Sequence, residues 1–304
     1  MASEFHKIIK EICDELDIKC TMLSKDWIMM LEKDNKTKFI SGYKCDLNNQ
    51  GLGEVFDDKY AMYDVLMSKN IPIIKYNIAY FESNKNDYAI GCNNYDYVLG
   101  LFHKYSNNIV IKTNTGSCGS GVYHVSSEEE LKTIYDKLSR KNFSISVCPY
   151  YETVNEFRGC IVNNKIKLFY KKIKPVVIGD GKSTIKELLV KFNANYFKDY
   201  DNDTVLKDGE VFEYDWRFNL ARGSMSSLDI NKEDEEKVRG IINDILEKLD
   251  VAFGSVDVIK TKDNQFFVME INSGLMMDNF MIQHENGREI AKEVYKEAII
   301  SLFK

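Results

Sequence analysis

Three oxygen-bearing side chains lie near the C-terminal end of the sequence, in the segment FGSVDVIKTKDNQFFVMEINSG at 253–274. Apolar and polar residues alternate on both sides of the polar turn TKDNQ, which predicts a β-hairpin. Side chains two apart on a strand share a face, so Glu270 and Asn272 point the same way and Asp257 can come level with them. Two carboxylates and one amide oxygen suit Mg²⁺ shared with phosphate. We therefore predict a magnesium site here; the alternative is a surface hairpin with a solvated polar face.

A lysine next to a glycine-rich run could bind phosphate. Lys112 ends the apolar segment IVIK and directly precedes TNTGSCGSG. From that position its ammonium could bind phosphate oxygens while amides of the loop donate to them. The order differs from the P-loop pattern, in which the lysine follows the glycines. An ordinary hairpin loop with an exposed lysine would also give this pattern.

The segment NEFRG places an acid and a guanidinium on one strand face, as Glu156 and Arg158. The carboxylate could accept both hydroxyls of a ribose, and the guanidinium could bind phosphate or a carboxylate. The alternative is a cross-strand salt bridge on a solvated face. Lys171 and Lys172 end the next strand, and alternation puts only one of them on the face of Glu156.

Cationic and amide donors occur together in the segment DWRFNLARGS, upstream of the hairpin. Alternation with apolar neighbours predicts a strand that places Arg217 and Asn219 on one face, with Arg222 in the turn that follows. Such donors near a metal site could bind a carboxylate, or the oxyanion formed as it reacts. A surface strand is the alternative.

Length, charge and cysteine usage limit the class of protein. The chain has 304 residues, 44% of them hydrophobic, with a net charge of −6, seven cysteines and four histidines. It can hold two domains, and the acidic total argues against nucleic acid as the main partner. We find no signal peptide, no bilayer-spanning apolar run and no C-x-x-C pair, which predicts a reduced, cytoplasmic protein that is not membrane-bound. The histidines lack zinc-ligand spacing.

Three parts of the chain are expected to position these residues. Residues 1–56 form a short α/β segment: a helix capped by Ser3, a hairpin, and the polar loop DLNNQGLGEV. Residues 57–148 alternate helices and strands, including a strand IPIIKY and a helix that begins at Ser126. Residues 149–304 contain an antiparallel pair around an Asn-Asn turn, a helix capped by Ser183 or Thr184, and the hairpin at 253–274.

In chain order, the motifs are DDK at 57–59, VIK with its glycine-rich loop, EFR, VIGDGKSTIKELL, WRFNLARG, VDVI and EIN. Together they resemble those of the ATP-grasp superfamily of carboxylate–amine ligases, from residue 57 to the C-terminus. The run VIGDGKSTIKELL is similar to one in cyanophycin synthetase and in the ATP-grasp half of bifunctional glutathione synthetase. The R-x-N-L-x-R-G segment resembles RimK-type glutamate ligases. The resemblance implies an α+β, ATP-grasp fold, with two α+β lobes clasping ATP between antiparallel sheets behind the short N-terminal segment.

By the same resemblance, ATP and two Mg²⁺ ions are expected, with Mn²⁺ as an alternative metal. The metal ligands would be Asp257, Glu270 and Asn272. The nucleotide-binding residues would be Lys59, Lys112, Ser117, Gly119, Gly121, Glu156 and Lys172. The residues that meet the acyl phosphate and the substrate carboxylate would be Arg222, Arg217 and Asn219.

Two departures from the family pattern concern the ends of the site. Cys148, Pro149 and Tyr150 stand where relatives often carry an acidic residue that contacts adenine. After EIN the chain continues as SGLMMDNF, without the proline that most relatives have, and this segment usually borders the amine substrate. The identity of the substrates is therefore left open.

The implied reaction joins a carboxylate to an amine through an acyl phosphate and converts ATP to ADP and phosphate. The substrates would be small molecules or peptides, and relatives are often homo-oligomers. Two alternatives stay open. One is a phosphotransferase on the same scaffold that acts on a hydroxyl. The other is a non-catalytic nucleotide-binding module.

Overall fold

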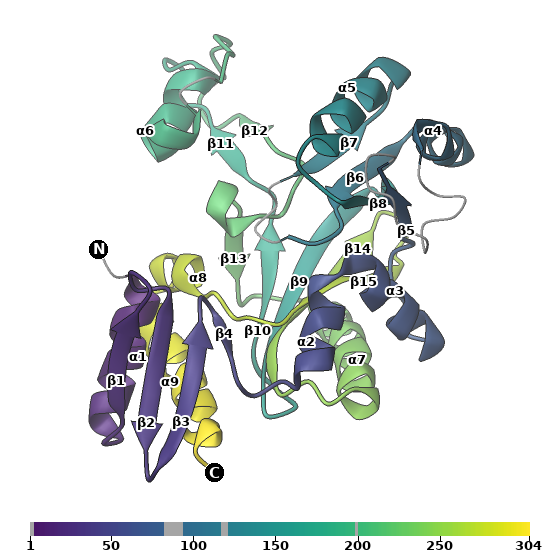
Figure 1. Cartoon of the computed structure of the whole chain (residues 1–304). Coiled ribbons are helices and arrows are strands. Elements are labelled where there is room, and N and C mark those ends of the chain that lie inside the picture. Colours follow the sequence, from purple (N-terminus) through teal and green to yellow (C-terminus); the bar gives the residue numbers. More distant parts are fainter. Residues whose placement is uncertain (1–2, 82–93, 117–120, 198–199) are drawn as a thin grey trace.

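The computed structural model describes residues 3–81, 94–116, 121–197 and 200–304. One of its parts is a four-stranded antiparallel sheet in the order β5–β8–β6–β7, covered by two helices (Figure 1). The elements of this sheet and its helices are β5 (Asn77–Tyr80), α4 (Tyr95–Lys104), β6 (Ile109–Thr113), β7 (Val122–Val125), α5 (Glu128–Ser139) and β8 (Ser144–Pro149). Ser127 caps α5, one residue after the predicted start.

The central sheet has five antiparallel strands in the order β13–β10–β9–β14–β15. The strands are β9 (Thr153–Val162), β10 (Lys165–Ile173), β13 (Met225–Ser227), β14 (Phe253–Thr261) and β15 (Phe266–Asn272). Its apolar face packs on α3 (Lys59–Ser68) and α7 (Lys232–Lys248). The predicted hairpin at 253–274 is confirmed as β14 and β15. The predicted pair around Asn163 and Asn164 is confirmed as β9 and β10, with both asparagines at positive φ as a two-residue hairpin turn requires.

The two ends of the chain form one compact part, at the lower left of Figure 1. Its elements are α1 (Glu4–Glu15), β1 (Lys19–Leu23), β2 (Ile28–Lys33), β3 (Lys36–Ser41), β4 (Lys44–Cys45), α8 (Asp278–Gln283) and α9 (Gly287–Leu302). We call it the terminal lobe. Apolar side chains of α1 and α9 share one core. The predicted boundaries at 56/57 and 148/149 stay predictions.

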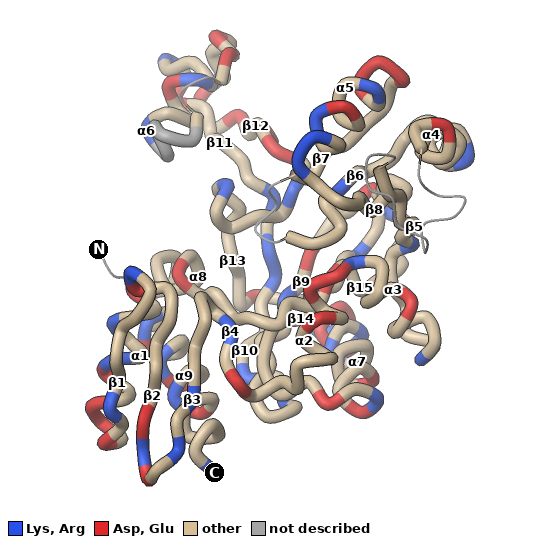
Figure 2. Tube along the Cα trace, viewed as in Figure 1, with Lys and Arg blue, Asp and Glu red and all other residues tan. Residues whose placement is uncertain are grey.

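Opposite charges line the contact between α1 and α9. Arg288 donates to Glu4 and Glu11 at 2.9 and 2.5 Å, and Lys292 lies 2.7 Å from Glu15. Figure 2 shows these charges along the two helices. Hydrogen bonds from Lys292 and Lys296 lower the pKa of Glu15 to about 2. These pairs hold the two ends of the chain in register, although exposed pairs add little stability individually.

The predicted polar loop at 46–55 is wrong, because most of it lies in the helix α2 (Gln50–Asp57). The Asn49 side chain accepts from the Leu52 N–H at 2.8 Å, which is a helix N-cap. Leu52, Val55 and Phe56 recur at helical spacing and pack on the central core. Burial of this stripe outweighs the low helix propensity of the two glycines in the segment.

Two predicted strands are also wrong. The segment IPIIKY makes only a single bridge, from Ile73 to Val268 in β15. The segment around Arg217 is irregular and ends in the 3₁₀ helix η1 (Leu220–Arg222). Asn219 caps η1 through a 2.9 Å hydrogen bond from the Ala221 N–H, and this local bond competes with an extended backbone.

A small extension stands away from the body at the upper left of Figure 1. It contains β11 (Val176–Ile178), α6 (Ile185–Phe197) and β12 (Val211–Glu213), with a core of its own. Thr184, one of the two predicted caps, forms a capping box with Glu187. In the described part of the chain, every helix is too short or too polar to cross a membrane.

Candidate active site

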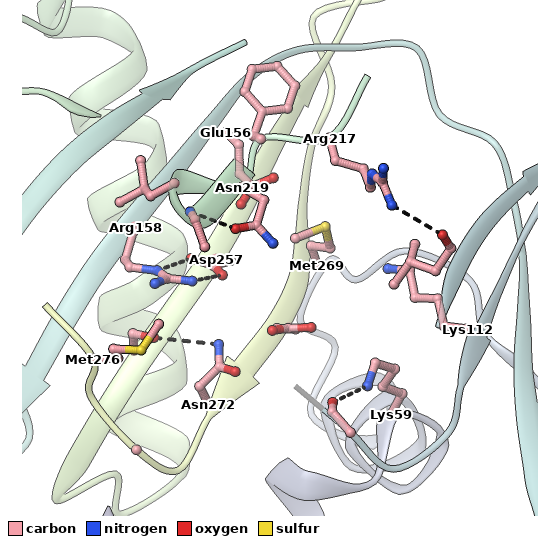
Figure 3. Close-up of a pocket in the computed structure, with 18 of the residues that line it drawn as sticks. Lys59, Lys112, Glu156, Arg158, Arg217, Asn219, Asp257, Met269, Asn272 and Met276 are labelled. Atoms are coloured by element: carbon pink, nitrogen blue, oxygen red, sulfur yellow. Dashed lines mark hydrogen bonds and ion pairs between the residues drawn. The ribbon is translucent and has the colours of Figure 1, made fainter. Parts of the chain in front are cut away.

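A cavity of about 540 Å³ opens between the four-stranded sheet and the polar face of the central sheet (Figure 3). This volume is within the range of ligand sites, about 300–1,000 Å³. Residues from both sheets, from η1 and from the terminal lobe line it. Among the described residues of the lining, six are lysine or arginine and four are aspartate or glutamate.

The three predicted metal ligands come together on the cavity wall. Asp257 is the cross-strand partner of Glu270, and Ser255 is the partner of Asn272. A β-bulge directly after Asp257 locally shifts the register of the hairpin. Asp257, Glu270 and Asn272 all line the cavity, so the predicted convergence of their side chains is present. Hard oxygen atoms in this arrangement fit Mg²⁺. Their role as ligands stays a prediction.

A buried network of charges surrounds Asp257. Arg158 on β9 donates to both of its carboxylate oxygens, at 2.7 and 2.6 Å, and Lys172 on β10 lies 3.2 Å away. Lys172 also binds Glu156, its cross-strand partner. Glu156 and Arg158 share a face, as alternation predicted, but this face is buried against the cavity and not solvated.

The charge of Asp257 should make stability depend on pH. Burial alone would raise the pKa of Asp257, but Arg158 and Lys172 lower it to about 2, from an ordinary value of about 3.9. A lowered pKa contributes stability that is complete above the ordinary value and is lost as the pH falls toward 2. Wild type should have a larger free energy of unfolding than Asp257→Asn. We expect this difference to be greatest above pH 5 and smaller at pH 3. Urea unfolding at both pH values measures it; a constant difference would contradict the assignment.

Two lysines face the hairpin of β14 and β15 from the other side of the cavity (Figure 3). Lys59, the first residue of α3, donates to the Gly116 carbonyl at 2.9 Å. Lys112 is buried and donates to the Tyr76 hydroxyl at 3.1 Å. Burial lowers the pKa of Lys59, and the carboxylate of Glu270 opposes this effect. The two cations thus lie where a polyphosphate between the sheets would pass.

The glycine-rich loop is only partly described. Ser117 and Gly119, two of the predicted nucleotide-binding residues, lie outside the described residues. Gly121 has φ +72°, and a Cβ there would lie 2.8 Å from Thr113 Cγ2, so this position requires glycine. The described residues that line the cavity include Gly116 but not Gly121.

Two of the three predicted oxyanion and carboxylate donors reach the cavity. Arg217 and Asn219 line the cavity, whereas Arg222 is outside its described lining. Arg217 binds Asp215 and donates to the Val122 carbonyl at 3.4 Å, which links this segment to β7. Arg222 also approaches Asp215, at 3.7 Å. The arginine that contacts the hairpin of β14 and β15 is Arg158, through Asp257.

Aromatic and apolar side chains form one end of the cavity. Tyr150 stacks on His124 with ring centroids 4.1 Å apart, and Trp216 contacts Tyr150 edge-on at 5.7 Å. Tyr151, Ile259 and Met269 complete this end of the lining. A planar base fits such a surface. Cys148, in contrast, is buried and directed at the Val110 carbonyl.

Sequence reasoning did not identify the residues at the opposite end. Trp27, Ser41, Tyr43 and Lys44 of the terminal lobe line the cavity there. They lie more than 200 positions from the hairpin that they face, and no local pattern predicts that contact.

Comparison with known proteins places the fold. No protein-family model matches the chain. The chain is 26% identical to cyanophycin synthetase of Geminocystis herdmanii over 60% of its own length and 22% of the relative. It therefore spans less than a quarter of the length of the curated relatives that it matches.

Two solved structures are similar over nearly their whole length. The D-alanyl-alanine synthetase A of Vibrio cholerae has a TM-score of 0.55 at 13% identity, with 98% of this chain and 96% of that chain covered. A RiPP-associated ATP-grasp ligase of Chryseobacterium gregarium, solved with ADP and a leader and core peptide, has a TM-score of 0.53 at 13% identity, with 97% and 92% covered. The predicted resemblance and the α+β, ATP-grasp fold are confirmed.

Proposed function

We propose that this chain, which has the ATP-grasp fold, is an ATP-dependent ligase that joins a carboxylate to an amine. The observation that carries the proposal is the cavity itself. Two carboxylates and an amide oxygen on one wall face two lysines on the other, and a flat aromatic surface lies at one end. This arrangement matches a nucleoside triphosphate that binds lengthwise.

The cavity supports a definite orientation of ATP. The base lies against Tyr150, Tyr151 and Met269, and the phosphates lie between the hairpin and the pair Lys59 and Lys112. Glu156 and Lys172, which the resemblance assigned to the ribose and the phosphates, lie level with Ile259 in the register of the sheet, two residues from the level of Asp257. The remaining residues of the glycine-rich loop are proposed to cover the phosphates and to exclude water.

Asp257, Glu270 and Asn272 would hold Mg²⁺. When bound, two ions would neutralise phosphate charge during transfer, with Mn²⁺ as a substitute. The protein's own cations would act beside them. Arg158 lies against Asp257, so its guanidinium is placed to stabilise the substrate carboxylate and the oxyanion that forms from it, with Arg217 and Asn219 on the adjoining wall. We assign Arg222 the lesser role of ordering the segment through Asp215.

The reaction has two steps. A carboxylate oxygen of the first substrate bonds to the γ-phosphorus of ATP as the bond to the β-phosphate oxygen breaks, which releases ADP. The amine nitrogen of the second substrate then bonds to the acyl carbon. The bond from that carbon to the phosphate oxygen breaks, and the departing phosphate takes up the proton that the amine loses. Much of the rate enhancement comes from holding the two substrates and ATP side by side in the orientation of the reaction.

The substrates are proposed to be amino acids or peptides. Two solved ligases that match over nearly the whole of both chains support this: one is a D-alanyl-alanine synthetase, and the other is in complex with a leader and core peptide. We further propose a cytoplasmic protein that acts on soluble substrates, without nucleic acid or membrane as a partner, and that forms a homo-oligomer.

One assay tests this function. Purified protein is incubated with MgATP and a panel of amino acids and dipeptides, with hydroxylamine added to trap an acyl phosphate. We expect a hydroxamate with the correct acid, and ADP and free phosphate in equal amounts when an amine is present. ATP binding without a hydroxamate or an amide from any acid would refute the ligase. ADP formed without free phosphate, alongside a phosphorylated hydroxyl compound, would instead indicate a phosphotransferase.

A further inference from the structure

We propose that the terminal lobe forms the binding wall for the amine substrate, and that this substrate is an amino acid or a peptide N-terminus with an apolar side chain. Trp27 would bind the apolar side chain, and Lys44 would bind the carboxylate of the amino acid. The inference rests on the ligase function proposed above. It assigns a role to the first 56 residues, which the sequence motifs leave without one.

The order of residues along β14 fixes which end of the cavity receives the amine. Ile259 lies at the aromatic end, Asp257 two residues further, and Ser255 two residues beyond that, a span of about 13 Å. Phosphate transfer takes place at Asp257, so the carboxylate substrate must lie beside it. The amine attacks from the side away from the nucleotide. That side is the end formed by Asn272, Ser273 and the terminal lobe.

Several bonds fix the terminal lobe to this end of the hairpin. The Asn48 side chain exchanges two hydrogen bonds with the backbone of Phe253, at 3.0 and 2.6 Å. The Leu275 N–H donates to the Tyr43 carbonyl at 3.0 Å. The Ser273 hydroxyl donates to Asp57 at 2.8 Å, and Lys44 forms an ion pair with the same carboxylate. The wall is therefore built into the site and does not depend on a mobile contact.

Trp27 is unusual for a tryptophan because it is 60% exposed at the rim of a cavity. It follows a turn in which Ser24, Lys25 and Asp26 all have positive φ. Its ring lies on Gly42, where a Cβ would come within 2.8 Å of Cη2. One face of the indole is thus held by the lobe, and the rest is available to a ligand.

The chemistry of this end favours an apolar amino acid. Tyr43, Leu220 and Met276 lie in the lining with Trp27 and supply apolar surface. The cation at this end is Lys44, whose side chain is half exposed. An ammonium has three donors, so Lys44 can keep Asp57 and also bind a carboxylate. A cationic side chain would lose its hydration against this apolar surface, and Asp57, the carboxylate nearby, is already bound by Lys44 and Ser273.

The test measures amide formation by the full chain with MgATP and its carboxylate substrate, with leucine, phenylalanine, lysine and leucinamide as amines. We expect leucine and phenylalanine to be preferred over lysine by at least tenfold in kcat/KM. Trp27→Ala should raise KM for leucine about tenfold or more and leave KM for ATP within twofold, and Trp27→Phe should restore most of the loss. Phe39→Ala is the matched control, since Phe39 is an exposed aromatic of the same lobe outside the described lining.

Lys44 is tested by comparing leucine with leucinamide, which lacks the carboxylate. Wild type should prefer leucine, and Lys44→Gln should abolish the preference, whereas Lys19→Gln, at an exposed ion pair with Glu32, should keep it. An unchanged preference, or a Trp27→Ala variant with wild-type KM for leucine, would overturn the proposal while the ligase function stands.

A binding measurement covers the case in which wild type forms no amide and the ligase function itself fails. The chain has two tryptophans, so the emission change that wild type shows and Trp27→Phe lacks reports on Trp27 and leaves Trp216 in place. We expect leucine, added with MgADP, to shift the Trp27 emission to the blue. A shift without amide formation would support the binding of the amino acid by the terminal lobe and refute the ligase function. The absence of a shift would refute the binding role of the terminal lobe.

Discussion

Glu270→Gln should lower kcat at least a hundredfold and leave the fold intact. Glu270 is half-buried on the cavity wall, and in the described part of the chain no side chain forms a hydrogen bond or ion pair with it. Glutamine has the same shape and removes only the charge. If the carboxylate holds Mg²⁺, its loss costs several kcal/mol of transition-state stabilisation, and about 3 kcal/mol already corresponds to a hundredfold.

The measurement is turnover as a function of Mg²⁺ concentration, together with thermal unfolding. We expect half-maximal activity to require much more Mg²⁺ in the variant, with a melting temperature close to that of wild type. Asp263→Asn, in the exposed turn of the same hairpin, is the matched control and should behave as wild type. If Glu270→Gln kept wild-type turnover and Mg²⁺ dependence, the carboxylate would not be a metal ligand, and a non-catalytic nucleotide-binding role would be favoured.

Asp257→Asn is a less selective probe of the same site. Asp257 is only 1% exposed and is bound by Arg158 and Lys172. Removing its charge would leave Arg158 without its carboxylate partner and Lys172 with Glu156 alone, and the loss of a buried partner destabilises a protein strongly. A loss of activity in that variant would therefore combine effects on metal binding and on folding. Glu270 separates the two because it carries no such structural pairing.

The sequence predicted those parts of the site that depend on local alternation. Asp257, Glu270 and Asn272 belong to one hairpin, so a period of two and a short turn were sufficient to place them on one face. The same reasoning placed Glu156 and Arg158 together. It could not predict that Arg158 binds Asp257, because the two residues are 99 positions apart and are brought together by sheet order.

The predictions that failed were those in which packing or a local cap decided the structure. At 50–57 an asparagine cap and an apolar stripe form a helix despite two glycines. At 217–222 Asn219 caps a 3₁₀ turn, so alternation in the sequence did not produce a strand. The contribution of Trp27 and Lys44 to the cavity depends on how the two ends of the chain pack together, and no segment of the sequence contains that information.

Lys172→Met should destabilise the protein by about 3–5 kcal/mol, because it removes the partner of a buried carboxylate. Glu156 is 4% exposed, and in the described part of the chain Lys172 is the side chain that binds it. Asp257, in contrast, keeps Arg158. At roughly 2–4 °C per kcal/mol, we expect the melting temperature to fall by about 10 °C. Lys19→Met, at the exposed pair with Glu32, should change it by no more than a few degrees.

A double variant distinguishes the loss of a pair from the loss of packing. Glu156→Gln together with Lys172→Met removes both charges and should be more stable than Lys172→Met alone.

Burial raises the pKa of Glu156, an effect that Lys172 opposes. Without Lys172 this pKa should rise further, so Lys172→Met should become more stable as the pH falls from 8 to 5, the opposite sign to the effect at Asp257. If the single and double variants had equal stability at both pH values, the buried pair would carry no coupling. The loss of stability in Lys172→Met would then come from packing. Groups other than Lys172 would have to position Glu156 to bind ATP.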